Sequence, residues 1–265
     1  MAVRKAYVDT EWGQMHFRVV RGDGTPLVMF HRTPASSASF ESLMTLMVGE
    51  RPLYAFDTPG FGQSFDPPGM PSIADYAAYM RAAFDALGLD RVHIFAHHTG
   101  THFATELAAA YPDRVAALIL NGIAYLTAEE REKFRATVAP PKKPDPEGRY
   151  AAETWTTVAG LFDEFDPDLT HAEFLGAMRA ITGRDQAFNA VWDQDYPATL
   201  DRVTCPVLAT CAENDMLRPF FDRVLADHPE FKSELLGPAK FFTPEYDAER
   251  TAAAIRAFLT DVESR

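Results

Sequence analysis

Short runs of β-forming residues alternate with helical patterns up to about residue 123, and this alternation limits the possible folds more than any other feature. The β-rich runs are MHFRVV, PLVMFH, LYAFD, RVHIFAH and VAALILNGI. Between two of them, apolar residues recur at helical spacing from Tyr76 to Leu87, behind a capping-box pattern at Ser72 and Asp75. The alternation predicts an α/β fold in which helices cover a parallel sheet.

The alternation stops after Ile123, and residues 127–200 look helical and irregular. It resumes with CPVLATC, a helix at 220–227, a strand at AKFF and a closing helix over 247–262. We therefore expect one domain, residues 1–265, with residues 127–200 inserted as a helical cap over the carboxyl edge of the sheet. Ligands bind at that edge in open α/β sheets. A further helical layer of the core would explain the same pattern.

Composition and charge narrow the class of protein. The chain is 47% hydrophobic and 24% charged, as in ordinary globular proteins, and its net charge of −13 disfavours binding to nucleic acid or to an anionic membrane surface. The amino-terminal segment lacks the apolar stretch of a signal peptide, and no apolar run reaches the roughly 18 residues of a membrane span. Cys205 and Cys211 flank one predicted strand, which favours reduced thiols in a cytoplasmic protein. The sequence leaves a homo-oligomer open.

A turn between a strand and a helix is predicted at FAHHTG, residues 95–100. A turn that lifts one side chain above a sheet needs small residues two positions before and two positions after its tip. Ala96 and Gly100 meet this requirement if His98 is the tip, whereas tips at His97 or Thr99 do not. The sequence therefore places an imidazole where the turn meets the ligand edge of the sheet.

Four segments, in this order, resemble the α/β-hydrolase superfamily over nearly the whole chain. FHRTPASS is similar to the oxyanion loop, DTPGFGQS to the Asp-x-Pro-Gly-x-Gly-x-Ser loop, and HIFAHHTG to the nucleophile elbow. CPVLATCAENDMLRP is similar to the strand that delivers the catalytic acid, which implies Asp215 in that role. The resemblance implies an α/β-hydrolase fold with a mostly parallel central sheet, flanking helices and a helical cap. The pairing of His-x-Thr-Pro with His-His-Thr-Gly resembles an atypical bacterial subset.

The departures from the superfamily pattern concern its catalytic triad. His98 stands where the superfamily carries a nucleophilic Ser, Asp or Cys. Phe241 or Phe242 stands where its catalytic histidine is expected, and Arg32 replaces a glycine of the oxyanion loop. Two members of a Ser-His-Asp triad are thus missing, which argues against a conventional acyl-enzyme route.

The remaining groups suggest a different base. Imidazole exchanges protons near neutral pH, and Asp215 could hydrogen-bond His98 and fix its tautomer. Backbone N–H groups of Thr99 and of Arg32 or Thr33 would form the oxyanion hole. We expect a cofactor-independent enzyme that hydrolyses a small carbonyl compound at an ester, a lactone or a C–C bond. A lyase, decarboxylase or isomerase could use the same base, and a non-catalytic small-molecule binder would also explain the lost triad.

Other side chains have competing interpretations. We expect His102, Trp192 and Phe241 in the substrate pocket, and His31 either there or as a brace of the oxyanion loop. The Arg32 side chain would bind a substrate carboxylate or lie in solvent. His98 and His102 have the i, i+4 spacing of zinc ligands, but no Glu follows His98 as in His-Glu-x-x-His, so we expect no metal site.

A few residues are expected to have structural roles. Asp57 should stabilise its turn, Glu245 should cap a helix, and His228 should lie on the surface. The aromatic residues of the insertion should belong mainly to the core, with one or two lining a pocket. These residues are Trp155, Phe162, Phe165, Trp192 and Tyr196.

Overall fold

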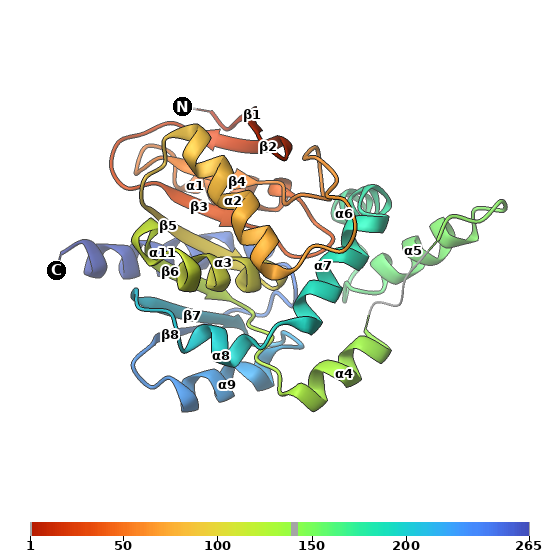
Figure 1. Ribbon diagram of the computed structural model, residues 1–265. Helices are drawn as coiled ribbons and strands as arrows, with labels where there is room; N and C mark the ends of the chain where they lie inside the picture. The colour runs from red at the N-terminus through yellow and green to blue at the C-terminus, as the bar shows by residue number, and fades with distance from the viewer. Residues whose placement is uncertain (1, 139–142, 265) are drawn as a thin grey trace.

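An eight-stranded sheet forms the centre of the computed structural model, which describes residues 2–138 and 143–264 (Figure 1). Its strand order is β1-β2-β4-β3-β5-β6-β7-β8. The strands are β1 (Arg4–Thr10), β2 (Gly13–Val20), β3 (Leu27–Phe30), β4 (Leu53–Phe56), β5 (Val92–His97), β6 (Val115–Asn121), β7 (Val207–Ala212) and β8 (Lys232–Leu236). β2 is antiparallel to β1 and β4, and every other pairing is parallel. The predicted mostly parallel sheet is confirmed.

Helices cover both faces of this sheet. α2 (Ile73–Leu87) and α3 (Thr99–Ala110) pack on one face, and α1 (Glu41–Leu46) and α11 (Ala248–Glu263) pack on the other (Figure 1). Successive strand residues point to opposite faces, so Val28 joins the first core and Met29 the second. Outside the segment between β6 and β7, the remaining helical elements are η1 (Ser37–Phe40), η2 (Pro112–Arg114), α9 (Arg218–Asp227) and α10 (Thr243–Tyr246).

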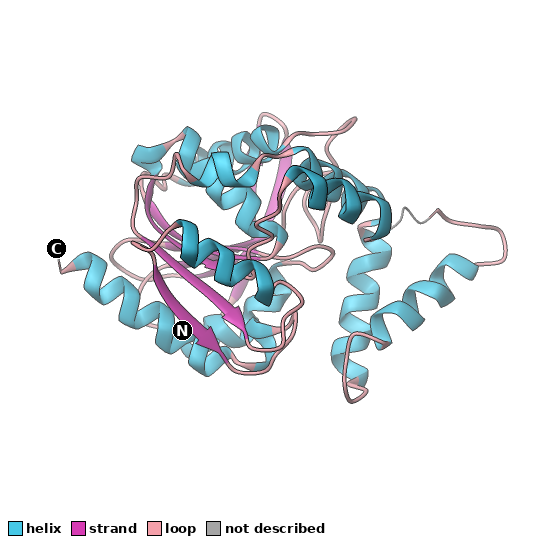
Figure 2. Cartoon of the chain, turned by 90° about the horizontal axis from the view of Figure 1, so that it is seen from below, coloured by secondary structure: helices cyan, strands magenta, loops and turns pink. Residues whose placement is uncertain are grey.

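Five helices lie between β6 and β7 in the chain. They are α4 (Ala128–Thr137), α5 (Arg149–Ala159), α6 (Pro167–Arg179), α7 (Ile181–Asp193) and α8 (Tyr196–Leu200). α8 packs on α3, whereas α4 to α7 lie beyond the carboxyl ends of the parallel strands (Figure 1). Figure 2 shows from below that part of this insertion projects well away from the sheet. The insertion therefore stands over the edge where ligands are expected.

Two local expectations are wrong. Residues of AKFF form a turn, and the last strand is β8, whose sequence KSELL alternates poorly in hydrophobicity. β8 pairs with β7 alone and is largely exposed, so polar side chains are tolerated and the strand pattern is weak. Trp155 and Phe165 are not core residues, because both rings are substantially exposed on the insertion.

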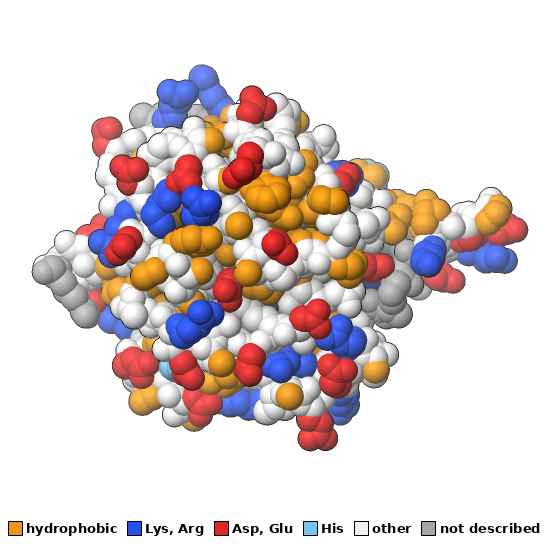
Figure 3. All heavy atoms as spheres, viewed as in Figure 1, with side chains coloured by type: hydrophobic (Ala, Val, Ile, Leu, Met, Phe, Trp, Pro, Cys, Tyr) orange, Lys and Arg blue, Asp and Glu red, His pale blue; other side chains and the backbone are white. Residues whose placement is uncertain are grey.

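Among the described residues, no helix is both long enough and apolar enough to cross a membrane. Figure 3 shows acidic and basic side chains interspersed on the face that α2 and α3 cover. The net negative charge is therefore not gathered into one patch on that face.

The insertion meets the core at a close crossing of two backbones. A Cβ atom at Gly183 of α7 would lie 2.2 Å from the Gly60 carbonyl oxygen and 2.7 Å from its carbon. Gly60 belongs to the loop after β4 and has φ +91°. Because backbone atoms cannot move aside as a flexible side chain can, this contact requires glycine in α7.

Gly183→Ala should lower the free energy of unfolding by about 1–3 kcal/mol, because the added methyl group forces α7 off the loop. Urea unfolding followed by circular dichroism measures this change. Gly160→Ala is the matched control, since Gly160 has φ −73° and its Cβ would lie 3.4 Å from the nearest atom. Equal unfolding midpoints for the two variants would show that the crossing is not tight.

Candidate active site

His98 occupies a sharp turn between β5 and α3. Its backbone has φ 48° and ψ −115°, an unusual conformation for a residue with a side chain. The turn is held because the His98 N–H donates to the Asn121 carbonyl (2.8 Å). A Cβ atom at Gly100 would lie 2.4 Å from the Phe30 carbonyl oxygen, which explains the small residue there. The turn and its tip lie where the sequence predicts them.

The imidazole of His98 reaches Asp215, which follows β7. Its Nε2 lies 2.7 Å from Asp215 Oδ2, and Asp215 Oδ1 accepts the Leu217 N–H at 2.8 Å. A carboxylate accepts hydrogen bonds, so Nε2 carries the proton and Nδ1 keeps its lone pair. Among the described residues, nothing hydrogen-bonds to Nδ1, and His98 lines the cavity described below. In the neutral ring, Nδ1 is thus the nitrogen that remains available as a base on a residue that lines the cavity.

Two neighbours allow the imidazole to take this position. A Cβ atom at Gly122 would lie 2.4 Å from His98 Cδ2 and 2.5 Å from Nε2, so a side chain there would displace the ring. The Phe241 ring lies 5.7 Å from the imidazole, edge on at 69°. Phe241 is one of the two residues that stand where the superfamily's histidine is expected, and here it packs against the residue at the turn.

The backbone N–H groups of Thr33 and Thr99 belong to residues that line the same cavity as His98. Thr99 is the first residue of α3, so its N–H has no acceptor within the helix. The Thr33 N–H points to Thr99 Oγ1 at 3.3 Å, which shows how closely the loop after β3 approaches the helix. Arg32, Thr33 and Thr99 all line the cavity. This geometry could bind an oxygen on which negative charge develops.

The cavity has a volume of about 240 Å³ and mostly apolar walls. The predicted pocket residues His102, Trp192 and Phe241 all line it. The insertion supplies further walls, with Phe134, Val138, Leu161, Arg184, Phe188 and Val191. His98 is therefore covered by residues from the segment between β6 and β7.

His31 does not line this cavity, so its expected place in the substrate pocket is incorrect. Its Nδ1 donates to the Arg32 carbonyl (2.8 Å), and its Nε2 accepts the Thr58 N–H (3.0 Å). Burial lowers the pKa of His31, which keeps the ring neutral for these two bonds. Of the two interpretations, the structure favours the brace of the loop.

Arg32 buries its side chain in the protein, although the residue also lines the cavity. Its Nη2 and Nη1 lie 2.6 and 2.8 Å from the two carboxylate oxygens of Glu173 in α6. Glu245 Oε1 lies 3.6 Å from Nη2, and the Phe242 ring lies 4.6 Å from the guanidinium carbon. The expectation of solvent exposure is wrong, because the insertion brings Glu173 onto this side chain.

Glu245 is buried beside this ion pair and does not cap a helix. Burial raises the pKa of Glu245 to about 7, against the attraction of Arg32 and with added repulsion from Glu173. The guanidinium of Arg32 thus faces two carboxyl groups, those of Glu173 and Glu245. Glu173 already binds it through both carboxylate oxygens. The second carboxyl group therefore keeps its proton up to about neutral pH.

Burial disfavours the charged forms of His97 and His102, the two other histidines near the turn. His102 Nδ1 donates to Gln194 Oε1 at 2.7 Å, and burial lowers the pKa of His102 to about 4. His97 is fully buried beside His98, and burial holds its pKa well below the usual range.

His228 is buried, against the expectation of a surface residue, because its ring stacks on Phe231 at 4.6 Å. Within residues 2–138 and 143–264, no cluster of three or more His, Cys, Asp or Glu could hold a metal ion.

Asp57 stabilises its turn, as the sequence predicts. It accepts the backbone N–H groups of Ser37 (2.7 Å) and Gln63 (2.8 Å) and binds His16 Nδ1 (2.8 Å). Burial acts to raise the pKa of Asp57, but these hydrogen bonds hold it well below the usual range. All of these contacts lie away from the cavity, which Asp57 does not line.

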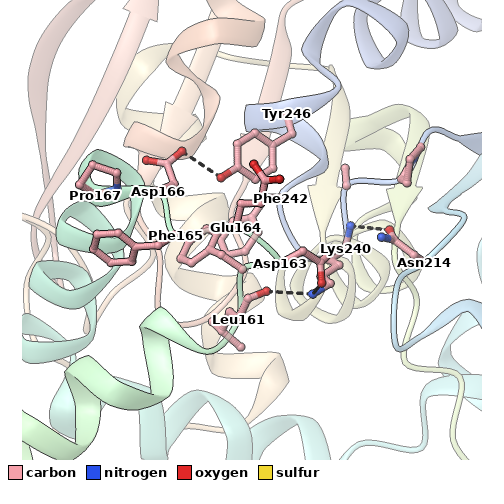
Figure 4. A pocket seen from close by; sticks show the side chains of 13 residues that line it. Leu161, Asp163, Glu164, Phe165, Asp166, Pro167, Asn214, Lys240, Phe242 and Tyr246 are labelled. Carbon is pink, nitrogen blue, oxygen red and sulfur yellow. Dashed lines mark hydrogen bonds and ion pairs between the residues drawn. The ribbon is translucent and has the colours of Figure 1, made fainter.

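A second cleft, of about 520 Å³, lies between the insertion and the segment before α10 (Figure 4). Lys240 in this cleft binds Asp163 and the Leu161 carbonyl, and the Tyr246 hydroxyl donates to Asp166 at 2.9 Å. The polar side chains of Lys240, Asp163, Tyr246 and Asp166 are thus paired within the cleft. The cleft does not contain His98 or Asp215, so it is not the candidate active site.

Sequence reasoning missed several contributors to the site. Glu173 and Gly122 carry no local signal, because their roles depend on contacts with distant segments. Arg184 does carry one, since it shares helical spacing with Ile181 and Phe188 and therefore faces the same side of α7.

The sheet order and the turn at its ligand edge define an α/β protein of the hydrolase type. The chain matches the family model described as alpha/beta hydrolase fold over residues 25–222. It is therefore a member of the α/β-hydrolase fold family.

Individual relatives agree with this assignment. A fluoroacetate dehalogenase from Burkholderia sp is 26% identical over 276 residues, which cover 93% of this chain and 90% of that enzyme. A haloalkane dehalogenase from Agrobacterium fabrum is 33% identical over 114 residues, but these are only 43% of this chain and 38% of that enzyme. The crystal structure of E-2-(acetamidomethylene)succinate hydrolase superposes with a TM-score of 0.80 at 21% identity, covering 97% of this chain and 99% of that one.

Glu245→Gln should stabilise the protein above neutral pH. A carboxyl group whose pKa is raised by folding contributes stability below its unfolded pKa of 4.5, and this contribution is lost as the pH rises through about 7. Glutamine has no charge to bury, so the variant should exceed the parent by on the order of 2–3 kcal/mol at pH 8 and match it near pH 4.5. Urea unfolding at several pH values measures the difference.

Glu249→Gln, at an exposed position of α11, is the matched control and should show no such trend. A stability difference for Glu245→Gln that does not change between pH 4.5 and 8 would contradict the buried-carboxyl interpretation.

Proposed function

We propose that this protein is a cofactor-independent hydrolase in which His98, supported by Asp215, acts as a general base on a small carbonyl compound. The observation that carries the proposal is the 2.7 Å hydrogen bond between Nε2 and the carboxylate, which leaves Nδ1 as a base at the cavity. The substrate is an ester, a lactone or a compound with an activated C–C bond. In this proposal His98 stands at the nucleophile elbow but abstracts a proton.

The proposed reaction begins when Nδ1 of His98 takes a proton from a water molecule, whose oxygen attacks the carbonyl carbon. Asp215 stabilises the imidazolium that forms. The carbonyl oxygen becomes negatively charged and is bound by the Thr99 N–H and by the Thr33 N–H, which exchanges its hydrogen bond to Thr99 Oγ1 for one to the substrate oxygen. When the tetrahedral intermediate collapses, the bond to the leaving group breaks and Nδ1 returns its proton to that group.

We further propose that residues 127–200 act as a cap over this reaction. Their side chains supply most of the apolar wall facing His98, including Leu161, Phe188 and Trp192. A cavity of about 240 Å³ with such walls suits a small, largely apolar substrate. Removal of water around the imidazole would strengthen each charge interaction in the reaction.

His98→Ala should lower kcat for a confirmed substrate by about 10²–10⁴-fold, the usual contribution of a general base. His98→Gln, which keeps a polar side chain without a basic nitrogen, should be equally impaired. His171→Ala is the control, because His171 is exposed on α6. Steady-state kinetics with an ester and lactone panel make the comparison, and unchanged turnover in His98→Ala would rule out the mechanism.

The same assay separates hydrolysis from the other uses of a base. Hydrolysis in H₂¹⁸O places one ¹⁸O atom in the acid product, which mass spectrometry detects. Product without ¹⁸O, together with deuterium uptake from D₂O at the carbon beside the carbonyl, would indicate a lyase or isomerase. Tight binding with no turnover of any panel member would indicate a non-catalytic binder.

A further inference from the structure

Helix α6 of the insertion contacts the loop after β3 on both sides of Thr33. One residue before Thr33, the Arg32 guanidinium binds the two carboxylate oxygens of Glu173 at 2.6 and 2.8 Å. One residue after it, a Cβ atom at Gly176 would lie 3.1 Å from the Pro34 carbonyl oxygen, so the helix backbone lies close to the loop there. Glu173 and Gly176 share one face of the helix, because residues at i and i+3 are neighbours on its surface. This face of α6 therefore lies against both neighbours of the residue whose N–H we assign to the oxyanion hole.

The Thr33 N–H belongs to the peptide unit that joins Arg32 to Thr33. Because a peptide unit is planar, the direction of this N–H is fixed by the direction of the Arg32 carbonyl. That carbonyl accepts hydrogen bonds from His31 Nδ1 (2.8 Å) and from the Ala35 N–H (3.0 Å), which both belong to the same stretch of chain. The link from this peptide unit to the insertion is the Arg32 side chain, which ends on Glu173.

The ion pair between Arg32 and Glu173 is buried, with the two side chains 4 and 6% exposed. A buried ion pair seldom stabilises a fold more than apolar residues of similar size would, because both charges lose their hydration. What it does provide is a fixed geometry, since the guanidinium and the carboxylate meet at two points. Glu245 approaches the same guanidinium only to 3.6 Å and belongs to α10 rather than to the insertion. Glu173 is therefore the carboxylate that fixes Arg32 relative to the insertion.

We propose that Glu173 is a positioning residue for the reaction: through Arg32 it holds the Thr33 N–H where the substrate oxygen becomes negatively charged. This inference rests on the proposed function, because it takes Thr33 as an oxyanion donor. The Thr33 N–H must exchange its 3.3 Å contact with Thr99 Oγ1 for one to the substrate, so its direction matters. A displacement of a reacting or binding group by about 1 Å can cost a reaction roughly 10²-fold. The insertion thus supports the oxyanion hole in addition to walling the cavity.

Two ketones that differ in their tendency to form an oxyanion test this role. 1,1,1-Trifluoro-4-phenylbutan-2-one adds water to form a tetrahedral hydrate, and loss of one hydroxyl proton to His98 Nδ1 leaves an oxyanion for the donors of Thr33 and Thr99. 4-Phenylbutan-2-one has the same apolar body but remains a neutral ketone. Calorimetric titration of each into the full chain measures both affinities. We expect the parent protein to bind the trifluoromethyl ketone at least about 10-fold more tightly.

Glu173→Gln should weaken binding of the trifluoromethyl ketone by about 10- to 100-fold and change that of the neutral ketone by less than about 3-fold. With a confirmed substrate it should lower kcat in the same proportion and leave KM nearly unchanged, since the oxyanion forms only in the transition state. Arg32 keeps a carboxyl group beside it in this variant, because Glu245 lies 3.6 Å away. An equal loss for both ketones, or no loss for either, would overturn the positioning role.

Asp66→Asn is the matched control. Asp66 lies in the loop after β4 and binds Arg179 of α6 at 2.9 Å, so this variant also removes an ion pair between the same helix and the core. It should keep both the preference for the trifluoromethyl ketone and the turnover of the parent. A loss of preference as large as in Glu173→Gln would mean that any loosening of α6 has this effect, and would contradict a specific role for Glu173.

A double variant keeps the test decisive if Glu173→Gln does not fold. Arg32→Met combined with Glu173→Met removes both charges of the buried pair, a change that folded proteins tolerate better than the loss of one partner. It should lose the preference for the trifluoromethyl ketone by the same 10- to 100-fold, about the effect of a misplaced oxyanion donor. A double variant that folds and keeps the preference would overturn the proposal.

Failure of the positioning role can be told apart from failure of the proposed function. Loss of turnover in His98→Ala, with the preference unchanged in Glu173→Gln, would reject the positioning role alone. A preference that Glu173→Gln abolishes, with turnover unchanged in His98→Ala, would reject the base mechanism alone. Equal affinity of the parent protein for the two ketones would reject the oxyanion hole and this inference with it.

Discussion

The hydrogen bond between His98 Nε2 and Asp215 Oδ2 is the contact around which the ligand edge of this protein is arranged. It joins residues that follow β5 and β7, which are separated in the sheet by β6. The imidazole can cross that distance because the residue after β6 is Gly122, whose missing side chain leaves room for the ring. The Phe241 ring packs edge on against the imidazole. The substitution at the turn is therefore accommodated by at least two other positions.

Arg32 shows how a second departure from the superfamily pattern changes the role of its position. A glycine in the oxyanion loop would leave only backbone there, whereas Arg32 extends a guanidinium into the protein and binds Glu173 of the insertion. The same guanidinium lies against Phe242, and Phe242 stacks on Phe162 of the insertion at 4.6 Å. The loop that carries the Thr33 donor is thus tied directly to the segment over the cavity. Because the ion pair between Arg32 and Glu173 links the two segments, a shift of the insertion would also move the Thr33 N–H.

The mostly parallel sheet and the turn at His98 could be predicted from local patterns and chain order, whereas Asp215 was a candidate partner only through the resemblance to the superfamily. Ala96 and Gly100 identify the tip of the turn by steric need alone, and parallel strands bring their carboxyl ends to one edge. The direction of the Arg32 side chain could not be predicted, since it is decided by Glu173, 141 residues away. β8 was missed for a different reason: an exposed edge strand needs no hydrophobic alternation. The brace formed by His31 likewise depends on a backbone N–H of Thr58 in another loop.

Two energetically costly features lie close together at this site. His98 holds a positive φ that costs on the order of 1–3 kcal/mol for a residue with a side chain, and Glu245 is buried where its charged form is disfavoured. A protein that needed only to fold could relax either feature with a single substitution, for instance a glycine at the turn. The strained backbone instead raises an imidazole into an apolar cavity and orients it with a buried carboxylate. Such strain is retained where the surrounding structure imposes it, and the general base that we propose at His98 accounts for it better than a passive binding pocket does.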